Sequence, residues 1–221
     1  CNIDLFFKLE ANNPTGSFKD RGSAVEASVA KELGAKAMIL ASTGNMAASC
    51  ACYAAVAKIP CFVLVPENTN LAKLAQVIAF GGHIVEVKGN YNEAAKLAKE
   101  IAKEMEFYLA GDYAFRVEGQ KTAAFEIADQ LSFKLPDAII IPMGCGTNIS
   151  AYAKGFREYQ QLGLIDHVPQ LIGVEAQGAN AIFQSYSHRQ IKIKPLKTAN
   201  TIASAIAVTN PIDGEKALDA I

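Results

Sequence analysis

Short apolar runs that alternate with helical patterns are the feature that most restricts the fold. Most of these runs are continuously apolar, which is typical of parallel strands covered on both faces. We interpret the following runs as strands: "AMILA" at 37–41, "CFVLV" at 61–65, "IVEV" at 84–87, "AIII" at 138–141 and "LIGVE" at 171–175. Between them, apolar residues recur at i, i+3, i+4 and i+7 from Ala94 and again from Ala124, as on a helix. The alternation predicts an α/β fold with parallel sheets flanked by helices.

Size and charge narrow the class of protein. The 221 residues are 51% hydrophobic and 19% charged, enough for a large core in two lobes. We expect a smaller lobe at about 35–110 and a larger lobe made of 1–34 and 111–221. A net charge of −1 without a basic block disfavours nucleic acid and acidic membranes as partners. No apolar run is long enough for a membrane span, and we expect a cytoplasmic protein.

The cysteines and histidines predict neither a disulfide framework nor a metal site. The cysteine count is odd, and Cys50 and Cys52 lie in the alanine-rich run "AASCACYAAVA", where cysteine acts as a small apolar residue. The histidines are scattered without the spacing of zinc ligands.

The stretch "NPTGSFKDRG" at 13–22 presents one lysine, Lys19, at the expected start of a helix. One interpretation is an ordinary helix start, in which Ser17 caps the helix and Asp20 suits its positive end. The other is that Lys19, held on a turn beside the aromatic Phe18, carries Schiff-base chemistry. This stretch alone does not decide between them.

A first polar loop follows the predicted strand at 37–41. Ser42, Thr43, Gly44 and Asn45 offer hydroxyls, an amide and backbone N–H groups at a helix N-terminus. Ligands of parallel α/β folds bind beyond the carboxyl ends of the strands, and such a terminus suits a carboxylate. The alternative is a plain N-cap, which needs only one such residue.

A glycine loop follows the predicted strand at 138–141. Met143-Gly144-Cys145-Gly146-Thr147-Asn148 can hold a phosphate with backbone N–H groups. It is not the dinucleotide fingerprint, because Ile149 takes the place of the third glycine. It is not a Walker A loop either, because no Gly-Lys-Ser/Thr follows. We therefore expect one phosphate and no nucleotide, with a tight turn as the alternative.

A lysine on a turn, a carboxylate loop and a single-phosphate loop together match pyridoxal 5'-phosphate and an amino-acid substrate. The motifs "KLEANNPTGSFKDRG", "ASTGN", "RVEGQKTAAFEIADQL" and "PMGCGTNISAYAKGF" also resemble the fold-type II pyridoxal-phosphate enzymes, the tryptophan synthase beta-like superfamily. Within it, the chain is most similar to the threonine synthase family, from about Phe7 to "NTIASAI" at 200–206. The resemblance implies two lobes with the cofactor between them.

The resemblance also implies residue roles. Lys19, the catalytic residue, would hold the cofactor and move the α- and β-protons, and Asn45 would hydrogen-bond the cofactor's ring oxygen. The reaction would convert O-phospho-L-homoserine and water to L-threonine and phosphate, in a homodimer. The expected cofactor-binding residues are Phe18, Lys19, Asn45, Gly144, Cys145, Gly146, Thr147 and Asn148; the expected substrate-binding residues are Ser42, Thr43, Gly44 and Arg116.

Four positions depart from the family's usual residues: Met46, Ala110, Gly111 and Cys145. They lie on the substrate-phosphate side of the family's site. The alternatives are therefore a cysteate synthase-like or threonine dehydratase-like enzyme, or a non-catalytic α/β module. We also expect a chain truncated at both ends, because no Ser or Thr partner for the pyridine nitrogen is found before Ile221.

Overall fold

The computed structural model describes residues 3–111 and 114–221. The chain divides into two compact units, Cys1–Gly119 and Gln120–Ile221. Residues 1–34 therefore group with the first unit, whereas the sequence prediction placed them with 111–221. The grouping follows from the packing of the helix at 19–32 against the helix at 45–57, because both helices belong to the first unit. The lobe boundaries of the enzyme stay a prediction.

The first unit is built on a four-stranded parallel sheet of order β3-β2-β1-β4. All five runs interpreted as strands are strands in the structure, and the sheet adds the two-residue β4, which the sequence analysis did not predict. Ile39 of β1 pairs with Phe62 of β2 and with Leu109 of β4. The strands of this unit are β1 (Met38–Ala41), β2 (Cys61–Pro66), β3 (His83–Val87) and β4 (Tyr108–Leu109).

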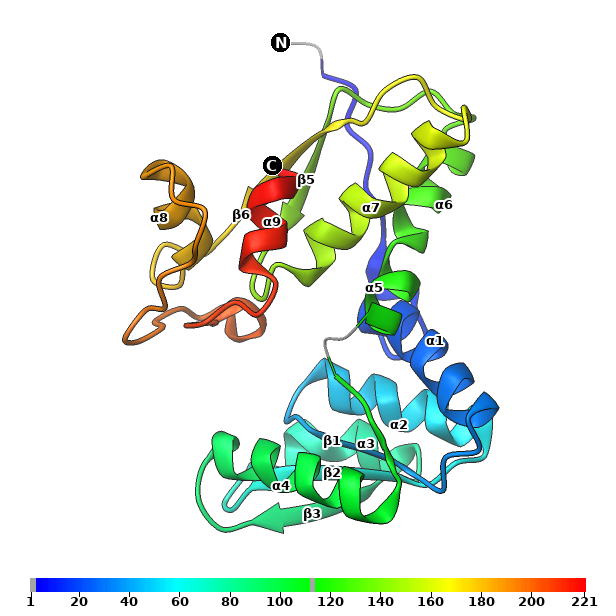
Figure 1. Cartoon of the computed structure of the whole chain (residues 1–221), viewed down its shortest axis with the longest axis vertical. Coiled ribbons are helices and arrows are strands. Elements are labelled where there is room, and N and C mark those ends of the chain that lie inside the picture. Colours follow the sequence, from blue (N-terminus) through cyan, green and yellow to red (C-terminus); the bar gives the residue numbers. More distant parts are fainter. Residues whose placement is uncertain (1–2, 112–113) are drawn as a thin grey trace. The chain divides into compact units, whose positions relative to one another are not determined.

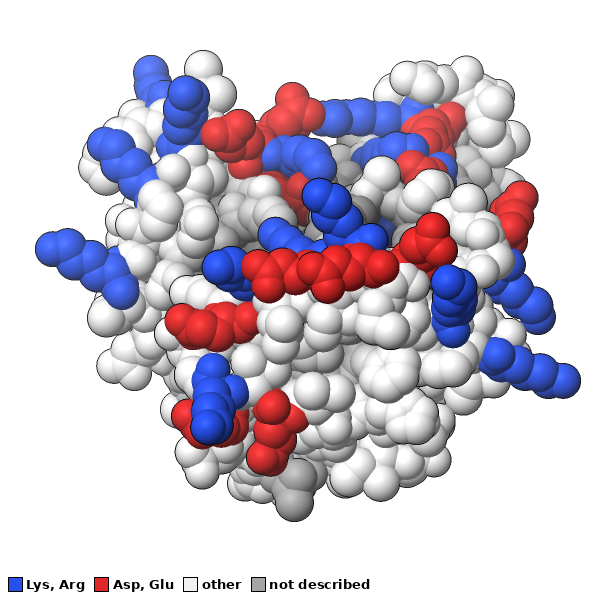
Figure 2. Space-filling model, turned by 60° about the horizontal axis from the view of Figure 1, so that its bottom comes forward, with Lys and Arg blue, Asp and Glu red and all other residues white. Residues whose placement is uncertain are grey.

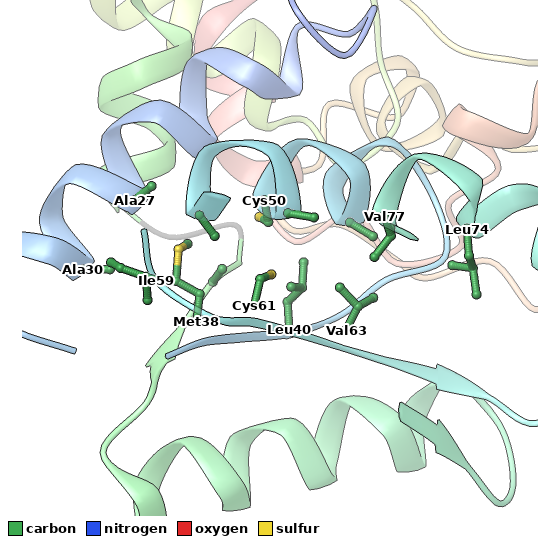
Figure 3. Close-up of a cluster of buried hydrophobic side chains, with 14 of the residues drawn as sticks. Ala27, Ala30, Met38, Leu40, Cys50, Ile59, Cys61, Val63, Leu74 and Val77 are labelled. Carbon is green, nitrogen blue, oxygen red and sulfur yellow. The ribbon is translucent and has the colours of Figure 1, made fainter. Parts of the chain in front are cut away.

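Helices cover both faces of this sheet (Figures 1 and 3). The helices α1 (Lys19–Glu32), α2 (Asn45–Ala57) and α3 (Ala75–Ala79) lie on one face, where Met38, Leu40 and Val63 enter a core with Cys50 and Cys61. Helix α4 (Tyr91–Met105) lies on the other face against Ile39 and Leu64. The central strands are thus buried on both sides, as their continuous apolar sequences predict. The unit also contains η1 (Glu10–Asn12), η2 (Leu71–Leu74) and α5 (Ala114–Gln120).

The second unit contains a two-stranded parallel sheet with helices. Its core joins Ile141 of β5 and Leu171 of β6 to Phe156 of α7 and Ala217 of α9. Ile140, Ile172 and Val174 of the same strands are 66%, 38% and 47% exposed, so burial on both faces does not hold for β5 and β6 in this chain. The elements are α6 (Thr122–Gln130), β5 (Ala138–Pro142), α7 (Thr147–Gln161), β6 (Gln170–Val174), α8 (Ala181–Ser187), η3 (Ser204–Ile206) and α9 (Gly214–Ala220).

The surface carries both signs of charge. Basic and acidic side chains are interspersed on the face drawn in Figure 2, consistent with the formal net charge of −1. Among the described residues, no helix is both long enough and apolar enough to cross a membrane.

Candidate active site

Lys19 is the first residue of α1, and the loop before it is pinned to that helix. The buried side chain of Asp20 accepts hydrogen bonds from the backbone N–H of Thr15 (2.7 Å) and from its hydroxyl (2.6 Å). The hydroxyl of Ser17 accepts from the Lys19 N–H at 3.2 Å, which serves the helix start although Phe18 is the N-cap residue. Asp20 therefore fixes the preceding loop as well as standing in the first turn of α1.

An ion pair further anchors this loop. The Arg21 guanidinium binds the Glu10 carboxylate through Nε at 2.7 Å and Nη2 at 2.8 Å, a bidentate geometry. The Asn13 amide donates to the Glu10 carbonyl at 2.7 Å. Because Gly16 adopts a φ of +76°, the chain can turn sharply just before Lys19. The motif "KLEANNPTGSFKDRG" thus forms a well-anchored loop that holds one lysine at the start of α1.

The Lys19 side chain is half-buried and lies beside an aromatic ring. Its Nζ is 4.8 Å from the centroid of the Phe18 ring, a cation–π distance. Phe18 thus lies beside this lysine, as expected from the sequence. Such a placement keeps Nζ on a pre-formed turn while leaving it reachable, which a covalent cofactor attachment requires.

The Ser42–Asn45 loop joins β1 to the N-terminus of α2. Gly44 is the N-cap residue without a side-chain cap, and its N–H donates to the Ser42 hydroxyl at 3.3 Å. A Cβ at Gly44 would meet no heavy atom within 4 Å, so the space beside this helix start is open. The first N–H groups of a helix lack intrahelical partners, and the loop can offer them to a carboxylate.

The glycine loop joins β5 to the N-terminus of the 15-residue helix α7. Its N-cap residue Gly146 has a φ of +85°, a conformation that favours glycine. A Cβ at Gly144 would lie 3.1 Å from the Ile206 Cα, so the backbone here is closely packed on one side. Glycines at both positions leave the loop lined by backbone N–H groups at the positive end of a helix.

These residues fit pyridoxal phosphate. The cofactor needs an amine for its aldehyde and N–H donors for one phosphate, and Lys19 and the 144–148 loop are of those kinds. Lys19 and the Ser42–Asn45 loop belong to the first unit, and the glycine loop to the second. The chemistry of the donor set therefore matches the cofactor.

Arg116 of α5 is completely buried, at 0% exposure. Its Nη2 pairs with the equally buried Glu26 carboxylate of α1, and its Nε donates to the Gly111 carbonyl at 2.9 Å. Its Nη1 donates to the Lys19 carbonyl at 3.4 Å, which brings Arg116 to the backbone of the candidate catalytic residue. The hydrogen-bond and ion-pair partners given above for Arg116 are all groups of the protein itself. The expected contact of Arg116 with a substrate phosphate stays a prediction.

The same cluster includes Cys50 of α2 and Ser23 of α1. Arg116 Nη2 donates to the Cys50 sulfur at 3.4 Å. Burial raises the pKa of the Cys50 thiol, and the nearby guanidinium offsets this effect only in part. Cys50 is therefore a packed thiol, as its alanine-rich sequence setting indicates.

Several charged residues that contact the candidate site residues or their loops were not singled out from the sequence. Glu26 binds Arg116, Arg21 binds Glu10, and Asp213 binds Thr147 of the glycine loop. Burial of a charged side chain is the signal that identifies them, and a single sequence does not display it. For Glu26, its i+7 spacing from Lys19 places both residues on one helix face.

One protein family matches the whole length of the chain. The family described as pyridoxal-phosphate dependent enzyme matches residues 1–221. The chain belongs to this family of α/β enzymes, which confirms the fold class and the family resemblance predicted from the sequence.

Within the family, the chain is similar to threonine synthases. It is 47% identical over 220 residues to the threonine synthase of Methanocaldococcus jannaschii, covering 99% of the chain and 54% of that relative. It is 42% identical to the Methanosarcina acetivorans enzyme, covering 98% of the chain and 54% of the relative. The chain thus spans about half the length of these curated relatives.

Solved structures share the fold. Maize serine racemase superposes with a TM-score of 0.84 at 26% identity, covering 97% of this chain and 63% of that one. The processed form of threonine deaminase isoform 2 from Solanum lycopersicum gives 0.82 at 27% identity, covering 96% of this chain and 57% of that one.

Proposed function

We propose that the protein to which this chain belongs is a threonine synthase, a lyase that converts O-phospho-L-homoserine and water to L-threonine and phosphate. The observation that carries the proposal is the anchored loop that presents Lys19. A lysine opens α1 on a loop held by Asp20 and by the Glu10–Arg21 pair, in a chain that is 47% identical over 220 residues to a threonine synthase.

Each sequence-predicted site residue has a role in this proposal. Lys19 would hold the cofactor covalently before the substrate binds, and would then move protons at Cα and Cβ of the substrate. Ser42, Thr43 and Gly44 would bind the substrate carboxylate at the start of α2, and Asn45 would hydrogen-bond the ring oxygen of the cofactor, which Phe18 would also help to bind. The loop Gly144, Cys145, Gly146, Thr147 and Asn148 binds the cofactor phosphate, mainly through backbone N–H groups.

The cofactor, when bound, supplies an electron sink that stabilises negative charge at the substrate's reacting carbons. The chain's own contribution is position and proton transfer. Lys19 is half-buried and its Nζ lies 4.8 Å from the centroid of the Phe18 ring, so the amine is held at a fixed place from which it can transfer protons. The rigid loop before α1 limits the motion of its backbone, which favours a reproducible geometry.

The substrate phosphate is proposed to be recognised near Arg116. A guanidinium matches a phosphate in geometry and charge, and its Nη1 contacts the Lys19 carbonyl. The complete burial of Arg116 favours a second candidate, a related β-replacement or dehydratase enzyme that does not use this arginine for a phosphate. A homodimer and a cytoplasmic location complete the proposal, on the support of the family resemblance.

The test uses the full-length protein with pyridoxal phosphate. We expect phosphate release from O-phosphohomoserine with formation of threonine, and a much lower kcat/KM for O-phosphoserine and for threonine deamination. Faster turnover of O-phosphoserine with sulfite, or of threonine to a keto acid, would support the second candidate. Binding of cofactor without turnover of any of these substrates would reject both.

A further inference from the structure

Asp213 contacts three consecutive residues of the glycine loop, although it lies far from them in the sequence. Its backbone N–H donates to the Cys145 carbonyl at 3.0 Å. Its carboxylate Oδ2 accepts a hydrogen bond from the Thr147 hydroxyl at 2.7 Å. Between these contacts, a Cβ on Gly146 would lie 2.7 Å from the Asp213 carbonyl oxygen. The loop is therefore shaped against the residue that precedes α9.

The contact is buried, and its charge is compensated. Asp213 is 5% exposed and Thr147 is 2% exposed. The other carboxylate oxygen of Asp213 pairs with the Lys216 Nζ at 2.6 Å, one turn along α9. A buried carboxylate without partners is costly, but here each oxygen has a donor. The pair also offsets the negative charge that would otherwise stand near a bound phosphate.

The arrangement decides which donors the loop can offer. A threonine hydroxyl has one proton, and that of Thr147 is directed to Asp213. Thr147 can therefore contribute its backbone N–H to a phosphate, but not its hydroxyl proton. Between the two Asp213 contacts, Gly146 adopts a φ of +85°, a conformation that residues with a Cβ rarely adopt. For Thr147, the position of its backbone, rather than its side-chain donor, therefore matters for phosphate recognition.

We propose that Asp213 is a positioning residue for the phosphate-binding loop. It holds the backbone N–H groups at the start of α7 in the arrangement that receives the cofactor phosphate. This inference rests on the proposed function in that it takes the loop to bind that phosphate. Asp213 acts through Cys145, Gly146 and Thr147, without touching the cofactor itself.

The experiment compares the affinities of the full-length protein for pyridoxal phosphate and for pyridoxal by equilibrium dialysis. The ratio of the two dissociation constants isolates the contribution of the phosphate. We expect Asp213→Ala to weaken binding of pyridoxal phosphate by about ten- to a hundredfold, the loss typical of a hydrogen bond to a charged group. Binding of pyridoxal should change by less than about threefold.

Two further variants separate positioning from charge. Asp213→Asn keeps an oxygen acceptor for Thr147 and removes the charge, so we expect nearly unchanged phosphate recognition. Thr147→Val removes the hydroxyl but keeps the backbone N–H, and should weaken binding of pyridoxal phosphate to the same extent as Asp213→Ala. Because the two variants break the same contact, the variant that combines them should bind no more weakly than either alone. Amide hydrogen exchange at 145–147 in the cofactor-free protein should accelerate in Asp213→Ala and Thr147→Val but not in Asp213→Asn.

Asp219→Ala is the matched control. It removes a carboxylate that lies in α9, is 72% exposed and pairs with Arg157. The proposal is overturned if Asp213→Ala binds pyridoxal phosphate as the wild type does, or if it weakens pyridoxal binding equally. If Asp213→Asn weakens binding of pyridoxal phosphate as much as Asp213→Ala does, the positioning role is overturned, and the charge of Asp213 accounts for the effect instead. Equal affinity of the wild type for the two compounds would instead reject the loop assignment in the proposed function.

Discussion

Arg116 and Glu26 form an ion pair in which both side chains are completely excluded from solvent. The Glu26 carboxylate also accepts from the Gly111 N–H at 3.0 Å, and Arg116 Nε donates to the Gly111 carbonyl at 2.9 Å. The three residues thus close a ring of hydrogen bonds that ties α5 and Gly111 to α1. Gly22 makes room for this ring, because a Cβ there would lie 2.5 Å from the Arg116 Cγ.

Removing either charge alone should strongly destabilise the protein. Arg116→Ala or Glu26→Ala leaves a buried charge without its partner, which typically costs about 3–5 kcal/mol in the free energy of unfolding. Replacing both by apolar residues of similar size, as in Glu26→Leu with Arg116→Met, should recover most of that loss. Denaturant unfolding of the four proteins measures this, and a small effect of each single variant would contradict it.

The same double variant separates a structural role of Arg116 from recognition of the substrate phosphate. If Arg116 binds that phosphate, the stable double variant should lose about ten- to a hundredfold in kcat/KM for O-phosphohomoserine. Its affinity for pyridoxal phosphate should change little, because the cofactor phosphate is assigned to the glycine loop. Steady-state kinetics with O-phosphohomoserine decide the point, and wild-type kinetics in the double variant would make Arg116 a purely structural residue.

The fold was predictable because its signals are local. Continuous apolar runs predicted the strands, and β4 was not predicted because two residues, Tyr108 and Leu109, carry no periodicity. The charged partners behave differently. Nothing near Glu26 in the sequence indicates Arg116, and nothing near Thr147 indicates Asp213, because tertiary packing alone brings each pair together. The candidate site residues could be predicted from motifs, while the residues that hold them could not.

Alanine at Gly146 should impair phosphate binding more than alanine at Gly163. Both glycines adopt a positive φ, +85° and +72°, so both variants carry backbone strain of about 1–2 kcal/mol. At Gly163 the added Cβ meets no atom within 4 Å, whereas at Gly146 it meets the Asp213 carbonyl at 2.7 Å. We therefore expect weaker binding of pyridoxal phosphate in Gly146→Ala alone. Equal affinities of the two variants, measured by dialysis, would make the loop an ordinary turn.

Acid should weaken the contact between α6 and α7 through Glu158. Burial by itself raises the pKa of this carboxyl, but hydrogen bonds from Lys121 and Lys154 outweigh it and lower the pKa. Because the folded-state pKa lies below the unfolded one, the stabilisation is present above the unfolded pKa and is lost as the pH falls through the folded pKa. Glu158 is partly exposed, so the effect is small, roughly 0.5 kcal/mol.

Glu158→Gln tests this pH dependence. Unfolding in urea between pH 3 and 7 should show a smaller loss of stability on acidification than in the wild type, by that same ~0.5 kcal/mol. Glu104→Gln, at an exposed position of α4, serves as the matched control and should follow the wild-type curve. A Glu158→Gln curve that parallels the wild type would show that the ion pairs contribute nothing to acid sensitivity.

Lys19 should be the residue to which the cofactor is attached. It opens α1 on a loop held by Asp20, with Nζ 4.8 Å from the centroid of the Phe18 ring. In the full-length protein, borohydride treatment should fix the cofactor on the peptide that contains Lys19, as measured by mass spectrometry. Lys19→Ala should abolish this labelling and reduce turnover below detection, because it removes the amine that the proposal assigns to cofactor attachment. Lys31→Ala, at an exposed position of the same helix, should keep both labelling and activity. Reducible attachment to a different lysine in Lys19→Ala would refute the assignment.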